Sequence, residues 1–165
     1  MKARHPSFLV VEDNEDDQYF ILHALQKSWP HPIHSVSSGE EAILYLNGKG
    51  KYADRKEFPY PTTIMTDASM DDSLKLLENL KKNELWQVIP TIVLSGSHDP
   101  VDIKKVYALG ASCYLLKPCD NDKLTALMGK LVDFWNECEV PEIDLSGKQL
   151  DTAGEGNSGA GAKRQ

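Results

Sequence analysis

Short hydrophobic runs alternate along the chain with segments in which hydrophobic residues recur at every third or fourth position. The runs are rich in Val, Ile, Leu and Thr, which suits short strands of a sheet. They occupy residues 7–11, 33–36, 62–67, 91–94 and 112–116. A helical pattern follows each run. Because β/α alternation with right-handed crossovers produces parallel strands, we predict an α/β fold in which five helices cover both faces of a doubly wound, five-stranded parallel sheet.

Capping and helix-breaking residues divide the helical segments. The first helix begins in the acidic segment after the first run and is ended by Pro30. Asp99 and Pro100 are typical of a helix start, and Gly110 ends that helix. The last helix carries a hydrophobic stripe made of Leu124, Leu127, Met128, Leu131 and Trp135.

Two segments lack these patterns. Residues 49–61 are charged and contain Pro and Gly, so we expect a surface loop with no role in the core. Beyond Asp144 the chain turns to Gly, Ser, Ala and scattered charge, which is typical of a flexible tail. We therefore predict an N-terminal extension at residues 1–6, one domain at residues 7–138 and a flexible C-terminal tail at residues 139–165.

Composition narrows the class of protein. The chain has 165 residues, 41% hydrophobic and 26% charged, which fits one soluble domain. Its net charge of -7 argues against non-specific binding to nucleic acid or to an anionic membrane. No hydrophobic run reaches the ~20 residues of a membrane span, and no signal peptide is recognisable. The three cysteines are odd in number and form no C-x-x-C pair, so neither a disulfide framework nor a zinc site is suggested. Because free thiols are typical of a reducing compartment, a cytoplasmic location is expected.

Polar residues follow the predicted strands. Glu12 and Asp13 follow the first, Asp67 ends the third, Ser95 follows the fourth and Lys117 follows the fifth. In an open parallel sheet, functional groups collect at the carboxyl ends of the strands. Carboxylates crowded there repel one another unless a cation binds or their pKa values rise. The sequence thus predicts a site for a divalent cation.

Mg²⁺ is the cation expected, because it prefers oxygen ligands and retains several waters. We predict that Asp13 and Asp67 bind it together with a backbone carbonyl near Ser69, and that Glu12 contacts it through water. With a hydroxyl and an ammonium nearby, this set describes a receptor for a phosphoryl group. Asp67 is the predicted nucleophile. Lys117 neutralises phosphoryl oxygens, and Ser95 donates a hydrogen bond.

These elements, in this order, resemble the receiver domain of two-component response regulators. The resemblance covers residues 7–135 and is carried by Leu9-Val10-Val11-Glu12-Asp13, Asp67, Val93-Leu94-Ser95-Gly96 and the segment from Gly110 to Pro118. It implies a flavodoxin-like sheet ordered 2-1-3-4-5, and transfer of a phosphoryl group from a sensor histidine kinase to Asp67. It also implies that Ser95 and Tyr114 act as switch residues, and that the peptide bond before Pro118 is cis.

Finer features are similar to the small stand-alone regulators that partner bacterial phytochrome histidine kinases. They include the Cys113-Tyr114 pair, the long loop before Pro61, and Phe134-Trp135. That similarity implies a phytochrome-type kinase as partner. A spare hydrophobic face on the last helix makes a homodimer a further hypothesis.

One departure from the family keeps an alternative open. The link between Asp67 and the third predicted helix is about two residues shorter than usual, and Asp71 and Asp72 add negative charge beside the site. A degenerate receiver that binds its partner without phosphorylation is therefore the second hypothesis. A phosphatase of the haloacid-dehalogenase type is the third, but its D-x-D nucleophile motif is not matched by Asp13-Asn14-Glu15. We expect phosphorylation and dephosphorylation of the chain itself, and no other enzymatic activity.

Overall fold

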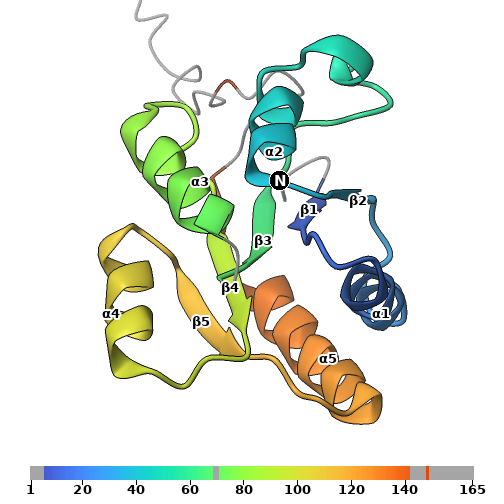
Figure 1. Cartoon of the computed structure of the whole chain (residues 1–165). Helices are drawn as coiled ribbons and strands as arrows, with labels where there is room; N and C mark the ends of the chain where they lie inside the picture. Colours follow the sequence, from blue (N-terminus) through green and yellow to red (C-terminus); the bar gives the residue numbers. More distant parts are fainter. Residues whose placement is uncertain (1–5, 69–70, 142–147, 149–165) are drawn as a thin grey trace, which may run out of the picture.

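Five parallel strands form the sheet predicted from the sequence (Figure 1). The computed structural model describes residues 6–68, 71–141 and 148. The strand order is β2-β1-β3-β4-β5. The strands are β1 (Phe8–Val11), β2 (Ile33–Val36), β3 (Thr63–Asp67), β4 (Thr91–Ser95) and β5 (Cys113–Leu116). The α/β class, the flavodoxin-like topology and the strand order are therefore confirmed. The predicted N-terminal extension and flexible tail lie almost entirely outside the described residues.

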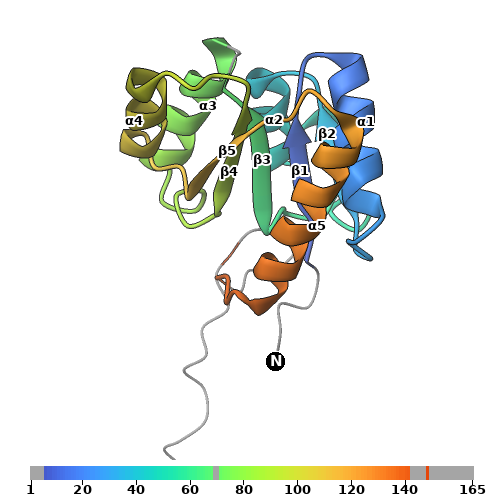
Figure 2. The same ribbon diagram turned by 90° about the horizontal axis from the view of Figure 1, so that it is seen from below.

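Five α-helices cover the two faces of the sheet (Figures 1 and 2). One face of the sheet is covered by helices α1 (Glu15–Gln26) and α5 (Asn121–Glu137). The other face is covered by α2 (Gly39–Leu46), α3 (Asp71–Lys82) and α4 (Pro100–Ala108). Successive side chains of a strand point to opposite faces. Accordingly, Phe8 and Val10 pack in the core under α1 and α5, whereas Leu9 and Val11 pack under α2 and α3. Within the described residues, no helix is both long and apolar enough to cross a membrane.

The segment between α2 and β3 contributes to the core, so the expectation of a surface loop without a core role is wrong. It contains a 3-10 helix, η1 (Gly50–Tyr52), and buries both Tyr52 and Tyr60. The Arg55 guanidinium donates hydrogen bonds of 2.8 and 2.7 Å to the carbonyls of Tyr45 and Leu46, at the end of α2. The Tyr45 carbonyl also accepts a 3.0 Å hydrogen bond from the N–H of Gly48. Arg55 therefore adds a charged donor to the last carbonyls of α2 and attaches the segment to this helix.

The register of the sheet aligns the ends of its strands. Val11 is paired with Thr66, so Glu12 is level with Asp67. The next pairings join Asp67 to Leu94 and Ser95 to Leu116, which places Lys117 at the same edge. Polar residues that are far apart in the sequence are therefore delivered to one end of the sheet.

Candidate functional site

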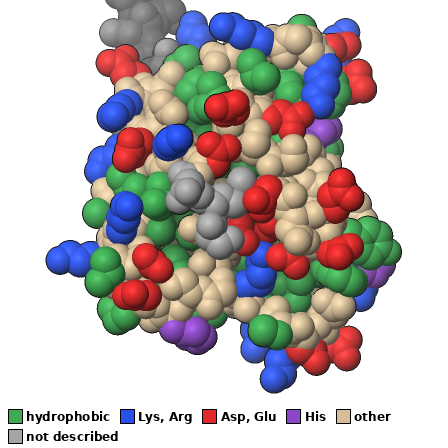
Figure 3. Space-filling model, viewed as in Figure 1, with side chains coloured by type: hydrophobic (Ala, Val, Ile, Leu, Met, Phe, Trp, Pro, Cys, Tyr) green, Lys and Arg blue, Asp and Glu red, His purple; other side chains and the backbone are tan. Residues whose placement is uncertain are grey.

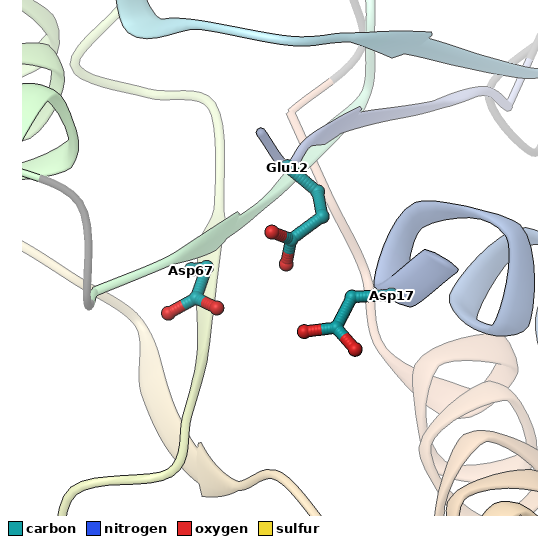
Figure 4. A group of neighbouring side chains, drawn as sticks. All are labelled: Glu12, Asp17 and Asp67. Atoms are coloured by element: carbon teal, nitrogen blue, oxygen red, sulfur yellow. The ribbon is translucent and has the colours of Figure 1, made fainter. Parts of the chain in front are cut away.

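The side chain of Lys117 joins three carboxylates at the carboxyl ends of the strands. Its Nζ lies 2.7 Å from Oδ2 of Asp67, 2.8 Å from Oδ2 of Asp17 and 3.0 Å from Oε2 of Glu12. Figure 4 shows the three acidic side chains pointing toward one another from separate elements. Their ligand atoms all lie within 4.8 Å of one another. The structure therefore brings together Glu12, Asp67 and Lys117, as predicted, and adds Asp17.

The first turn of α1 is fastened to the end of β1. Asn14 caps the helix: its side-chain oxygen accepts a 2.9 Å hydrogen bond from the backbone N–H of Asp17. The backbone N–H of Asn14 donates to Oε1 of Glu12 at 3.1 Å. In addition, the side-chain amide of Gln18 donates to the carbonyls of Glu12 and Val36. These contacts fix the position of Asp17 beside the strand ends.

Residues of α3 support Asp67 from behind. The hydroxyl of Ser73, which is fully buried, donates a hydrogen bond to the backbone carbonyl of Asp67. The Asp72 carboxylate accepts a 3.1 Å hydrogen bond from the backbone N–H of Gly39, the first residue of α2. An acid is favourable at a helix N-terminus. Asp72 was expected to add negative charge beside the site, but its carboxylate is engaged by α2 instead.

Burial and charge pull the titratable groups of this site in opposite directions. Burial raises the pKa of Glu12 to about 7, although hydrogen bonds from Asn14 and Lys117 act against this change. Burial also tends to lower the pKa of Lys117, but its hydrogen bonds to Asp17, Asp67 and Glu12 outweigh burial and raise it. The site therefore holds an excess of acid around one fixed ammonium. Three carboxylates at this spacing fit a hard divalent cation, which binds oxygen ligands.

The remaining predicted site residues lie in different surroundings. Asp13 is exposed and does not belong to the acidic cluster within the described part of the chain. Its predicted contact with the cation stays a prediction, as does that of Ser69, which lies outside the described residues. The peptide bond before Pro118 is trans, against the expectation from the family. Trans is the lower-energy isomer even before proline, by about 0.5–1 kcal/mol.

Ser95 and Tyr114 are connected through the backbone of Ser97. The hydroxyl of Ser95, buried at the end of β4, accepts a 3.2 Å hydrogen bond from the N–H of Ser97. The hydroxyl of Tyr114 donates a 2.8 Å hydrogen bond to the carbonyl of the same residue. The backbone of Ser97 therefore contacts both of the predicted switch residues.

The five-stranded parallel sheet and the acidic cluster at its carboxyl end are typical of a signalling receiver domain, and the cluster is compatible with phosphorylation. Residues 8–128 match the response regulator receiver domain family. This match covers most of the chain, and the chain therefore belongs to that family.

Two proteins illustrate the similarity. Response regulator Rcp1 of Synechocystis sp. is 29% identical over 132 residues, which is 78% of this chain and 88% of Rcp1. The crystal structure of the phosphorylated cyanobacterial phytochrome response regulator RcpA has a TM-score of 0.76 and 31% identity, and the match covers 84% of this chain and 99% of RcpA. A structure of the Mn²⁺-bound form of Rcp1 has a TM-score of 0.73 and 28% identity, covering 82% of this chain and 99% of that one.

Proposed function

We propose that this response regulator accepts a phosphoryl group from a sensor histidine kinase onto Asp67. The observation that carries the proposal is the contact between the buried Asp67 carboxylate and the Lys117 ammonium, beside two further acids. An ordinary structural ion pair would not need three carboxylates around one ammonium. A site that collects one nucleophilic carboxylate, a fixed ammonium and ligands for a cation is suited to phosphoryl transfer.

In the proposed reaction, an oxygen of the Asp67 carboxylate attacks the phosphorus of a phosphohistidine. The O–P bond forms as the P–N bond breaks, and the electron pair returns to the imidazole nitrogen. Lys117 moves from the Asp67 carboxylate to an oxygen of the incoming phosphoryl group and stabilises its negative charge. Mg²⁺, when bound by the acidic cluster, would neutralise charge on the phosphoryl oxygens. Water then hydrolyses the acyl phosphate, which releases inorganic phosphate and restores the Asp67 carboxylate. We propose no enzymatic activity beyond this phosphorylation and dephosphorylation of the chain itself.

The switch would start at Ser95. A phosphoryl oxygen on Asp67 is a strong acceptor, and the Ser95 hydroxyl has an O–H that can donate to it. We propose that the Ser95 side chain rotates toward the phosphoryl group to donate this hydrogen bond, and that the rotation carries its oxygen away from the N–H of Ser97. Because Tyr114 is bonded to the carbonyl of Ser97, the change would move Tyr114 on the face formed by α4 and β5 and alter partner binding there.

The relatives support the choice of partner and cation. RcpA is described as a phytochrome response regulator and was crystallised in a phosphorylated form, and Rcp1 was crystallised with Mn²⁺. We therefore propose a phytochrome-type histidine kinase as the phosphoryl donor, Mg²⁺ as the physiological cation and the cytoplasm as the location. The homodimer stays a hypothesis; the exposed Phe134 on α5 is its candidate contact.

Phosphorylation can be tested with acetyl phosphate and Mg²⁺, followed by intact-protein mass measurement. The parent chain is expected to gain one phosphoryl group, and Asp67→Asn is expected to gain none. Asp16→Asn is the matched control, because Asp16 is exposed and lies outside the cluster. Equal labelling of Asp67→Asn and the parent would show that Asp67 is not the acceptor. No labelling of the parent by acetyl phosphate or by candidate kinases would favour the degenerate receiver.

A further inference from the structure

The acidic cluster contains one carboxylate that the strand-end pattern does not predict. Carboxylate oxygens of Glu12, Asp17 and Asp67 lie within 4.8 Å of one another. Glu12 follows β1, Asp67 ends β3 and Asp17 comes from the first turn of α1 (Figure 4). Several acidic side chains also gather near the centre of the face seen in Figure 3. Asp17 thus adds to the cluster a carboxylate that comes from a helix and not from the end of a strand.

The space between these carboxylates already holds a cation. An ammonium has three N–H donors, and Lys117 lies within 3.0 Å of one oxygen from each of the three acids. Asp17 is therefore as close to the bound positive charge as the two buried acids are. When all four groups are ionised, two negative charges are left over. One divalent cation would neutralise them.

The exposure of the three acids differs in a way that suits cation entry. The side chains of Glu12 and Asp67 are only 2% and 6% exposed, whereas that of Asp17 is 45% exposed. A cation that arrives from solvent therefore reaches Asp17 first. The backbone of Asp17 is held by the Asn14 cap, so a change of its side-chain rotamer is enough to exchange the ammonium for a metal ion.

We infer that Asp17 is a direct ligand of the divalent cation, which would then be held by carboxylates from the first turn of α1, the residue after β1 and the end of β3. The inference rests on the proposed function, because it assigns a further residue to the metal site of the phospho-acceptor. The same contacts also fit a second role, in which Asp17 only holds Lys117 in place and does not bind the metal. The two roles differ in what happens when Lys117 is removed.

The first experiment is a calorimetric titration of the full chain with Mg²⁺. Asp17→Asn is expected to weaken binding at least about tenfold, the lower end of the effect seen when groups that support a metal site are lost. Asp16→Asn is the matched control, because it removes the same charge from the same helical turn. It is expected to change the affinity less than about threefold. A parent chain that does not bind Mg²⁺, or an Asp17→Asn variant within threefold of the control, would overturn the inference.

The second experiment repeats the comparison in a Lys117→Gln background. If Asp17 is a ligand, Asp17→Asn still costs about tenfold in Mg²⁺ affinity there. If Asp17 acts only by holding Lys117, the second substitution has no further effect, and the inference is wrong. Asn retains the backbone N–H that bonds to Asn14, so the cap of α1 is kept. Circular dichroism of each variant checks folding.

Acetyl phosphate labelling separates this inference from the proposed function. A chain that binds Mg²⁺ through Asp17 but is never labelled would overturn the phospho-acceptor role alone. A chain that is labelled, but whose Mg²⁺ affinity is unchanged by Asp17→Asn, would overturn only the assignment of Asp17 as a metal ligand.

Discussion

Replacing Lys117 by Met removes the ammonium and keeps an unbranched, largely hydrophobic side chain. Lys117 is 16% exposed, and its partners Glu12 and Asp67 are 2% and 6% exposed. Removing one partner of a buried ion pair costs ~3–5 kcal/mol. The contact with Asp17 adds little, because that carboxylate is 45% exposed and well solvated. We expect a loss of about 3 kcal/mol at pH 8, near the lower end of the range for a buried pair.

The lower end is expected because Glu12 can take up a proton. Burial already raises its pKa to about 7, and loss of the ammonium removes an opposing influence and raises the pKa further. At pH 6 the acidic cluster of the folded variant therefore carries one negative charge fewer than it does with Glu12 ionised. The loss of unfolding free energy caused by Lys117→Met should then be smaller at pH 6 than at pH 8. Millimolar Mg²⁺ should restore part of it, because a ligand that binds only the folded state stabilises that state.

Urea unfolding followed by circular dichroism, in EDTA and then in Mg²⁺, measures these differences. Lys130→Met is the control, because Lys130 is an exposed residue of α5. If Lys117→Met and Lys130→Met were equally stable at pH 8 in EDTA, charge repulsion within the acidic cluster would not be significant. The electrostatic argument for the cation site would then be refuted.

Two further predictions concern stability without metal. The raised pKa of Glu12, from 4.5 to about 7, means that its contribution is fully present below pH 4.5 and lost as the pH rises through 7. The loss in the free energy of unfolding is on the order of 3 kcal/mol. Between pH 4.5 and pH 7 the urea midpoint of the parent should therefore fall, and that of Glu12→Gln should change less. Parallel curves for the two proteins would contradict the raised pKa of Glu12. Arg55→Ala should cost about 2–3 kcal/mol, because three carbonyls lose a charged donor. Lys56 is exposed, so Lys56→Ala should cost under ~0.5 kcal/mol. Equal unfolding midpoints for the two variants would show that the hydrogen bonds of Arg55 do not stabilise the fold.

Most of the site could be located from the sequence because a parallel sheet aligns its strand ends. Once residues 8–11 and 63–67 were recognised as neighbouring strands, Glu12 and Asp67 had to lie at one edge. Asp17 could not be placed in the same way, because its position depends on the angle at which α1 leaves the sheet. Asn14 and Gln18 hold α1 by hydrogen bonds to Glu12, and Gln18 also bonds to the carbonyl of Val36 in β2, a contact that sequence spacing does not predict. The available signal was the capping Asn three residues before Asp17.

The core role of the segment between α2 and β3 does not follow from its composition. Its charged residues, Pro and Gly suggested a solvated loop, and they outnumber the aromatic residues that enter the core. Tyr52 and Phe58 pack with Tyr45 of α2, at ring-centroid distances of 4.9 and 6.1 Å. The Tyr45 hydroxyl donates to the carbonyl of Pro59 at 2.9 Å. Composition averaged over the segment hides such contacts, because burial of a few aromatic rings is enough to anchor a loop.

The first turn of α3 packs closely against the start of α2. A Cβ placed on Gly39, the first residue of α2, would lie 2.8 Å from the backbone carbonyl oxygen of Asp72 in α3. Only glycine leaves room for that contact, and the N–H of Gly39 in turn binds the Asp72 carboxylate. The same turn brings Ser73 to the carbonyl of Asp67. The start of α3 thus contacts both α2 and the end of β3, while Asp67 keeps its contact with Lys117.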